Sequence, residues 1–323
     1  MHTQELASPE GYQAAVFGSA YYVWEDPGFL RISGADRLDF LQRQTTNDIR
    51  LLEPASCVVT ALTNPAARIL DLLTLVDHSK SLLAITLPGH GGTTHQYLRS
   101  RIFFNDKVTV DDLSHEMTLI DLLGPGSLGL LAQLGMESAL VENRVMSWEM
   151  AGGLVQGFIQ RGLGYRLTCQ SNQAPALLAA LDRAGAVRLS YETFDLLRIE
   201  AGVPAGGQEL TDEYTPLEAG LGWAVSASKG CYTGQEVIAR QITYDKVTRH
   251  LAGLRLNQPV QTREEVFSTE EDRQVGKITS STISPRLGPI ALAILRRPND
   301  QPGTQVTLGN NNGLAATVVS LPF

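Results

Sequence analysis

The segment KGCYTGQEVIAR, residues 229–240, concentrates side chains that could do chemistry. Thr233 and Glu236 have the spacing of a T-x-x-E capping box, which predicts that a helix begins there and runs through VIARQ. Cys231 would then lie just before a helix N-terminus, with Lys229 two residues upstream. A helix dipole and a nearby ammonium both lower the pKa of a thiol and favour the reactive thiolate. The alternative is a cysteine buried beneath a loop, a common state of free thiols; the residue types leave both open.

A second group of polar residues precedes this segment, in RIEAGVPAGGQELTDEYTPLEAGLGW, residues 198–223. Arg198 and Glu200 alternate with apolar residues and are followed by glycines and prolines. A glutamate in such a position is most often a solvated helix carboxylate. If Glu200 instead faces a pocket, it suits an amidine-like edge, because two parallel N–H bonds fix the orientation of the ligand.

Two glycine-rich stretches are weaker signals. GPGSLG at 124–129 satisfies G-x-G-x-x-G between an expected strand and an expected helix, but a strand-to-helix turn needs glycines in any case. PGHGG at 88–92 resembles the glycine-rich oxyanion loop of some hydrolases. The chain has no G-x-S-x-G motif to supply the nucleophile, so we interpret PGHGG as a turn.

Composition narrows the class of protein. The 323 residues, 43% of them hydrophobic, allow two or three domains. A net charge of −8 argues against non-specific binding to nucleic acid or to anionic membranes. Three scattered cysteines form neither a disulfide framework nor the usual four ligands of a cluster, so we expect no metal held by this chain alone. MHTQELASPEGYQ lacks the features of a secretory signal and no apolar run reaches 18 residues, which favours a cytoplasmic protein without membrane spans.

Periodicity predicts the elements that position these groups. RILDLLTLVDHSKSLLAITLP reads as a hairpin, GGLVQGFIQRGLGYRLT as another, and YETFDLLRIEAG as a helix with Ser190 as N-cap and Gly202 as stop. From about residue 248, short apolar runs cut by turns indicate a small β-barrel. The fold class is therefore α+β.

Taken together, RIEAGVP, PLEAGL and KGCYTGQEVIAR resemble the signature of the YgfZ-like folate-binding proteins, relatives of the glycine-cleavage aminomethyltransferase (T-protein). ISGADRLDFLQRQTTNDI, GPGSLGLL and the tail extend the resemblance over nearly the whole chain. It implies α/β modules around a central channel, followed by a small C-terminal barrel. The folate-binding region would span residues 1–247, in two interleaved modules, and the barrel residues 248–323.

The resemblance also implies non-covalent binding of tetrahydrofolate or a derivative. Glu200 would be the pterin-binding carboxylate, with Phe194, Arg198 and Trp24 at the pocket. Arg240 is a candidate for the glutamate tail of folate, on its charge as much as on the resemblance. Pro27 stands where some relatives carry an aromatic folate contact.

The functional loop implied by the resemblance would serve the assembly or repair of iron–sulfur proteins, including enzymes that modify tRNA. Its partners would be iron–sulfur assembly proteins or client enzymes, with no direct contact to nucleic acid or membrane. A transient bond from Cys231 to iron, a persulfide or a partner thiol would be its chemistry, with a partner supplying the other ligands. The loop would consist of Lys229, Gly230, Cys231, Tyr232, Gly234, Gln235 and Glu236.

Three alternatives stay open. The first is a folate-dependent aminomethyltransferase or demethylating enzyme, in which Asp71 would act. The transferase branch carries paired aspartates where this chain has Asp71 followed by Leu72. That branch also lacks the cysteine of the KGCY motif. A thiol hydrolase or thiol transferase would need a histidine near Cys231 in space, and His250 is the nearest in sequence. A pure scaffold would bind neither folate nor electrophiles.

Overall fold

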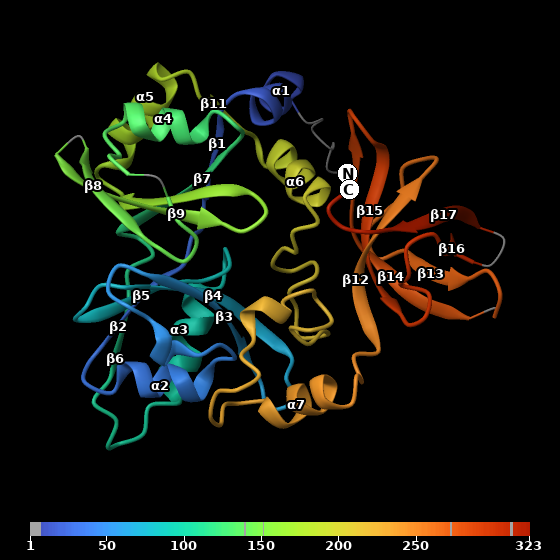
Figure 1. Ribbon diagram of the computed structural model, residues 1–323, viewed down its shortest axis with the longest axis horizontal. Helices are drawn as coiled ribbons and strands as arrows, with labels where there is room; N and C mark the ends of the chain where they lie inside the picture. The colour runs from blue at the N-terminus through green and yellow to red at the C-terminus, as the bar shows by residue number, and fades with distance from the viewer. Residues whose placement is uncertain (1–7, 139, 151, 272, 311–312) are drawn as a thin grey trace. The chain divides into compact units, whose positions relative to one another are not determined.

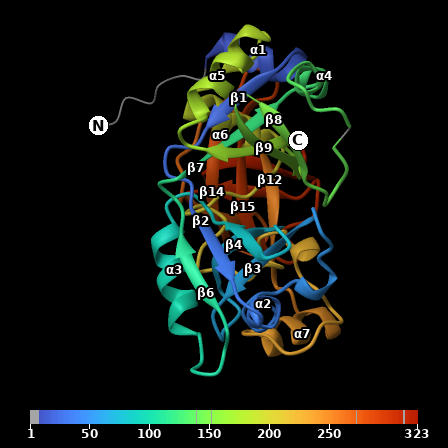
Figure 2. The ribbon, with the colours of Figure 1, turned by 90° about the vertical axis from the view of Figure 1, so that its left-hand side faces the viewer.

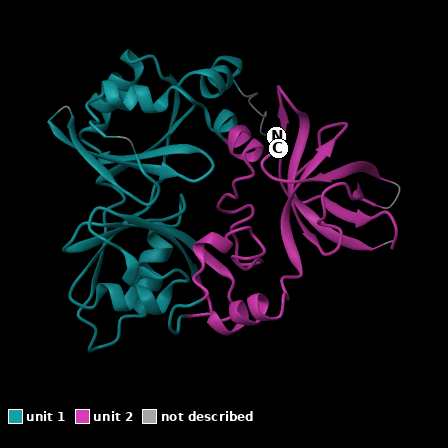
Figure 3. Ribbon diagram, in the orientation of Figure 1, with its two compact units in different colours: residues 1–62, 71–194, 228–232 teal, residues 63–70, 195–227, 233–323 magenta. Residues whose placement is uncertain are grey.

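The structure is a computed structural model that describes residues 8–138, 140–150, 152–271, 273–310 and 313–323 (Figure 1). The chain divides into two compact units (Figure 3). Unit 1 takes the described residues within 1–62, 71–194 and 228–232, and unit 2 takes those within 63–70, 195–227 and 233–323. Each unit is therefore assembled from segments that are distant in sequence.

The first sheet of unit 1 buries one face beneath helices (Figure 1). Its strand order is β11-β1-β7-β10-β9-β8, antiparallel except for the β11–β1 pair. Helix α5 (Ala174–Arg183) follows the amphipathic spacing, since Ala174, Leu177 and Leu181 are buried in the core of this sheet. Its other elements are α1 (Pro9–Phe17), β1 (Ala20–Val23), β7 (Met117–Leu123), α4 (Ser127–Gln133), β8 (Met146–Met150), β9 (Gly153–Gln160), β10 (Gly164–Gln170) and β11 (Val187–Arg188).

The second sheet of unit 1 has the order β3-β4-β5-β2-β6. Thr74 pairs with Ile85 and Asp77 with Leu82 in antiparallel register, so the hairpin expected around DHSK is confirmed. Figure 2 shows helix α3 beside β6. The two sheets meet through a shared apolar cluster that includes Phe29, Val76 and Phe158. The elements are β2 (Phe29–Ser33), α2 (Arg37–Gln44), η1 (Ile49–Leu51), β3 (Cys57–Thr63), β4 (Ile69–Asp77), β5 (Ser81–Ile85), α3 (Gly91–Ser100) and β6 (Thr109–Asp112).

Unit 2 contains the closed barrel, with strand order β12-β15-β14-β13-β16-β17. Alternate residues of its strands point inward, and Leu254, Val266 and Ala293 belong to its apolar interior. The predicted α+β fold with a small C-terminal barrel is confirmed. The strands are β12 (Arg249–Leu256), β13 (Glu265–Ser268), β14 (Gln274–Ser284), β15 (Gly288–Arg296), β16 (Gln305–Leu308) and β17 (Leu314–Val319).

Two helices carry the segments singled out by sequence. Helix α6 (Tyr191–Glu200) begins as predicted, since the backbone N–H of Thr193 donates to the Ser190 hydroxyl at 3.3 Å. It ends before Gly202, whose φ of +68° suits glycine. No helix in the described part of the chain is both long and apolar enough to cross a membrane.

The helix predicted to run through VIARQ is confirmed, but the prediction that Thr233 is its N-cap is wrong. Helix α7 (Gln235–Thr243) has Gly234 as its N-cap, with φ +85° and no side-chain cap bond. The left-handed turn at this glycine leaves Thr233 outside the helix, and the Thr233 carbonyl accepts a hydrogen bond from the Thr63 hydroxyl at 2.8 Å. Backbone geometry at glycine therefore outweighs the side-chain motif here.

Candidate functional site

Cys231 lies in the connection between η2 (Gly222–Ala224) and α7, and its side chain is exposed. Lys229, two residues upstream, and Tyr232, the next residue downstream, are buried, with exposed fractions of 6% and 8%. The alternative of a buried thiol is therefore wrong for Cys231. The segment presents one sulfur to solvent between two fixed side chains.

Lys229 fixes the upstream end of this segment within unit 1. Its ammonium donates to the carbonyl oxygens of Thr45 and Asn47 at 2.8 and 2.6 Å, and it lies 5.0 Å from the centre of the Tyr232 ring. Burial lowers the pKa of Lys229 to about 8, although the charge of Asp48 opposes that shift. The polar loop TTND, residues 45–48, therefore has a structural role, because two of its carbonyl oxygens bind the Lys229 ammonium.

Gly234 fixes the downstream end within unit 2. A Cβ at this position would stand 2.8 Å from the carbonyl oxygen of Asn64 and 3.0 Å from the Cα of Ala67. Only glycine accommodates both this close approach and the positive φ. Gly230 differs, because a Cβ there would meet nothing within 4 Å.

The structure brings together Trp24 and Phe194, two of the residues predicted to border a pterin. Their ring centroids lie 5.1 Å apart at 79°, and Tyr22 stacks on Phe194 at 4.6 Å. Burial raises the pKa of Tyr22 to about 12, so it stays neutral. Sequence reasoning missed Tyr22, although its place in the aromatic run AYYVW was a signal.

A buried ion pair supports this aromatic cluster. The Trp24 indole N–H donates to Asp121 Oδ2 at 2.9 Å, and Arg166 donates to both oxygens of Asp121 at 2.7 and 2.9 Å. Asp121 is 1% exposed. A bidentate guanidinium can satisfy a buried carboxylate in this way. The lone aspartate in the apolar strand TLIDLL was the signal that sequence reasoning missed.

Glu200 lies at the C-terminal end of α6 and is 7% exposed. Its carboxylate accepts a hydrogen bond from the Ser284 hydroxyl of β14, and its Oε2 lies 3.7 Å from a guanidinium nitrogen of Arg286. Its backbone carbonyl accepts from the N–H of Phe323 at 3.1 Å. The expectation of a solvated helix carboxylate is therefore wrong, and the partners from the barrel explain how the charge is tolerated.

Arg198 is held inside unit 2 by polar contacts. Its guanidinium donates to Asp195 at 2.8 Å, to Glu209 at 2.9 Å and to the Ser280 hydroxyl at 2.6 Å. Its side chain is 4% exposed and that of Glu209 is fully buried. These contacts give Arg198 a structural role that ties α6 to β14, and its assignment to cofactor binding stays a prediction.

Asp71, which would act only if the protein were a transferase, is fully buried in β4. Its Oδ1 accepts from the backbone N–H groups of Leu72 and Leu87 at 2.8 and 2.9 Å, and its Oδ2 accepts from the Thr94 hydroxyl at 2.5 Å. Burial raises the pKa of Asp71 to about 6, against the effect of these hydrogen bonds. The carboxyl joins β4, the segment that follows β5, and α3.

Arg240 is exposed on α7 and pairs with Glu236 one turn earlier, at 2.6 Å. Surface pairs at this spacing contribute only about 0.3–0.5 kcal/mol, so the guanidinium can exchange partners easily. In the described residues, no group of three or more His, Cys, Asp and Glu side chains is placed to hold a metal ion.

Residues 26–229 match the GCVT N-terminal domain, and residues 249–323 match the glycine cleavage T-protein C-terminal barrel domain. The chain belongs to the GCVT family. The family expected from the sequence is thereby confirmed at the level of the T-protein fold, whereas the YgfZ-like branch stays a prediction.

Individual relatives agree with the family. A chloroplastic protein of Arabidopsis thaliana, whose name describes it as a provisional transferase, is 30% identical over 302 residues, 92% of this chain and 69% of the relative. An aminomethyltransferase of Bacillus subtilis is 28% identical over 310 residues, 92% of this chain and 85% of the relative. The crystal structure of the glycine cleavage system aminomethyltransferase T from Bartonella henselae has a TM-score of 0.86 at 23% identity, covering 98% of this chain and 90% of that one. At that identity the structural match establishes the fold alone.

Proposed function

We propose that this GCVT-family chain is a tetrahydrofolate-binding protein that uses Cys231 in the assembly or repair of iron–sulfur proteins. The observation that carries the proposal is the exposed thiol of Cys231, displayed between the buried Lys229 and Tyr232. A segment built only to connect two elements has no need of an accessible thiol between two buried anchors. The YgfZ-like branch, to which the KGCYTGQE motif points, has the cysteine, and the transferase branch lacks it.

The residue types present fit a folate. A pterin offers a flat ring and an edge with two N–H donors. A buried carboxylate, Glu200, is the group that such an edge needs, and the aromatic side chains of Trp24 and Phe194 suit the ring. Arg240, exposed and weakly paired, suits the carboxylates of the glutamate tail. When bound, the cofactor would supply a carrier for one-carbon units.

The proposed chemistry of Cys231 is ligation. The thiol loses its proton to solvent and the thiolate binds iron of a cluster or of its precursor, without a change of redox state. Because a cluster needs about four protein ligands, an iron–sulfur assembly protein or client enzyme supplies the others. Lys229 positions the segment through its bonds to the carbonyls of Thr45 and Asn47. We place this activity in the cytoplasm.

The second candidate is a folate-dependent aminomethyltransferase, favoured by the names of the relatives. Asp71 would have to be its acid or base. The three hydrogen bonds that Asp71 accepts and its complete burial count against that role, since a general base must reach the proton that it removes.

The first test is an anaerobic calorimetric titration with tetrahydrofolate. Wild type should bind saturably, and Glu200→Gln should weaken binding by about tenfold or more, because a neutral amide cannot accept two N–H bonds as a carboxylate does. Glu271→Gln, an exposed carboxylate of unit 2, is the matched control and should bind like wild type. Equal affinity for all three proteins would exclude Glu200 as the pterin ligand.

The second test separates the two functions. Cells with Cys231→Ala in place of wild type should lose activity of iron–sulfur enzymes, while Asp71→Asn should leave that activity intact. Purified protein should show no aminomethyl transfer with tetrahydrofolate and an aminomethyl donor. Transfer activity that disappears in Asp71→Asn and persists in Cys231→Ala would establish the transferase instead.

A further inference from the structure

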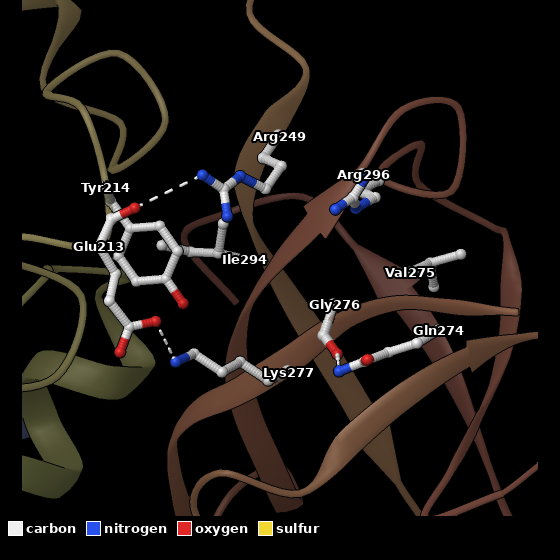
Figure 4. A pocket seen from close by; sticks show the side chains of 9 residues that line it. All are labelled: Glu213, Tyr214, Arg249, Gln274, Val275, Gly276, Lys277, Ile294 and Arg296. Atoms are coloured by element: carbon white, nitrogen blue, oxygen red, sulfur yellow. Dashed lines mark hydrogen bonds and ion pairs between the residues drawn. The ribbon is translucent and has the colours of Figure 1, made fainter. Parts of the chain in front are cut away.

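A pocket of about 180 Å³ lies in unit 2, beside strands of the barrel (Figure 4). Strands β12, β14 and β15 form one wall, and the loop around Tyr214 forms the other. Its lining residues are Glu213, Tyr214, Arg249, Gln274, Val275, Gly276, Lys277, Ile294 and Arg296.

The charge of this pocket is opposite to that of the chain. Among its lining residues, Arg249, Lys277 and Arg296 are cationic and Glu213 is the anionic one, although the whole chain carries a net charge of −8. A carboxylate outside the lining, Glu218, accepts from Arg249 at 2.9 Å, but it is shared with Arg68 at 3.3 Å. A positive excess therefore remains at the pocket.

Two of these cations lie directly opposite one another. Arg249 of β12 and Arg296 of β15 are cross-strand partners in the antiparallel register. Like charges in that position destabilise a sheet unless an anion compensates them. Glu218 compensates Arg249, whereas the described residues provide no hydrogen bond or ion pair for the exposed guanidinium of Arg296. The uncompensated positive charge of this pair therefore lies on Arg296.

Glu213 neutralises part of the positive charge that lines the pocket. Its carboxylate forms an ion pair with Lys277 and is about half exposed, with 56% of the side chain accessible. Partial burial lowers the pKa of Lys277, but the bonds with Glu213 and Tyr214 outweigh it and raise the pKa above its usual value. The buried Tyr214 ring forms the floor, with Arg249 at 5.3 Å and Lys277 at 5.6 Å from its centre. Figure 4 shows Lys277 and Glu213 pointing toward each other beside this ring.

We propose that this pocket binds a phosphate dianion, free or as a monoester, and that Glu213 is an internal competitor for the same cations. The ligand would take over Lys277 and pair with Arg296. Once Glu218 has paired with Arg249, the guanidinium of Arg296 and the ammonium of Lys277 still offer more N–H donors than the Glu213 carboxylate accepts, whereas a phosphate offers three oxygens and a double charge. Phosphate therefore matches the excess of charge and of donors better than a carboxylate does.

The experiment is a calorimetric titration with inorganic phosphate at mildly alkaline pH, with sodium chloride keeping the ionic strength constant. Glycerol phosphate is titrated in parallel, because it distinguishes a monoester site from a site for the free ion. The variants are Arg296→Met, Glu213→Gln and, as matched control, Arg255→Met, an exposed arginine on β12 outside the pocket. Circular dichroism of each variant verifies that the fold is retained.

Wild type should bind phosphate saturably, and Arg296→Met should weaken binding by about tenfold or more through the loss of charge-assisted bonds. Glu213→Gln should tighten binding by roughly two- to fivefold, because the exposed ion pair no longer competes for Lys277. Arg255→Met should match wild type. Equal effects of Arg296→Met and Arg255→Met would indicate non-specific attraction and overturn the proposal. Absence of saturable binding in both wild type and Glu213→Gln would also overturn it.

Discussion

Cys231 and Asp71, both in unit 1, are the reactive groups on which the two candidate functions depend, and their surroundings are opposites. Cys231 is exposed in a connecting segment, whereas Asp71 is fully buried in a strand. The oxygens of Asp71 already accept three hydrogen bonds. A carboxyl with a raised pKa is therefore not by itself a sign of catalysis, because burial alone produces the shift.

The surroundings of Cys231 are ordered although the thiol itself is accessible. Upstream of the thiol, the Lys229 ammonium binds two backbone carbonyls. Downstream, Gly234 packs too closely against neighbouring backbone for any other residue to replace it. A group that must meet a partner benefits from such anchoring, because little ordering entropy remains to be lost on contact. Substitutions at the two anchors and at Asp71 test this difference.

The largest effect is expected at Gly234. Gly234→Ala should lower the free energy of unfolding by about 3 kcal/mol, because the new Cβ meets the Asn64 carbonyl and the backbone stays at positive φ. Gly230→Ala should change it by less than about 0.5 kcal/mol, since nothing lies within 4 Å of its Cβ. Urea unfolding of both variants is the measurement. Similar losses in the two would show that the anchor does not depend on Gly234.

The next effect concerns the enclosure of Asp71. The folded state holds its proton up to about pH 6, against an ordinary pKa of 3.8, so this group contributes stability below about pH 4 that is lost as the pH rises through 6. Relative to Asp71→Asn, wild type should therefore lose about 2–3 kcal/mol of unfolding free energy between these pH values. Urea unfolding at several pH values gives this difference. A difference independent of pH would mean that Asp71 is ionised and solvated, and would reopen the transferase candidate.

Much of the fold could be predicted from the sequence, because local patterns and tertiary structure agree. The hairpin at DHSK and the N-cap at Ser190 each need only their own neighbours. Prediction from local sequence fails at Gly234. Thr233 and Glu236 have the spacing of a capping box, but the N-cap of α7 is the glycine between them. Only the contacts with Asn64 and Ala67, which are remote in sequence, explain that outcome.

The candidate site was harder to predict for the same reason. The residue type of Lys229 indicated a cation near the thiol, but its partners lie some 180 residues away, at separations of 184 and 182. Asp121 and Arg166 were missed because a buried ion pair between strands leaves no periodic signal in either strand. Glu200 was predicted from a resemblance, and its partner Ser284 from the barrel could not have been deduced from spacing.

A smaller effect is expected at the charged anchor. Lys229→Met leaves the carbonyls of Thr45 and Asn47 without the ammonium and should cost about 1–2 kcal/mol. Lys246→Met, an exposed lysine, should cost less than about 0.5 kcal/mol. Burial lowers the pKa of Lys229 to about 8 from 10.5, so wild type should gain stability relative to the variant as the pH rises between those values. A variant as stable as wild type at every pH would show that the carbonyls do not depend on the lysine.

The smallest effect on stability is expected at Cys231 itself, and this is what separates an accessible group from a structural one. Cys231→Ser should shift the free energy of unfolding by less than about 0.5 kcal/mol, because the side chain is exposed. Cys231 should nevertheless be the thiol that is alkylated, because Cys57 and Cys169 are buried and burial raises the pKa of each of these two thiols to about 11. Mass spectrometry after brief alkylation of the native protein should find one modified thiol in wild type and none in Cys231→Ser. Rapid modification that persists in the variant would place the reactive thiol elsewhere and remove the basis for assigning the function to this segment.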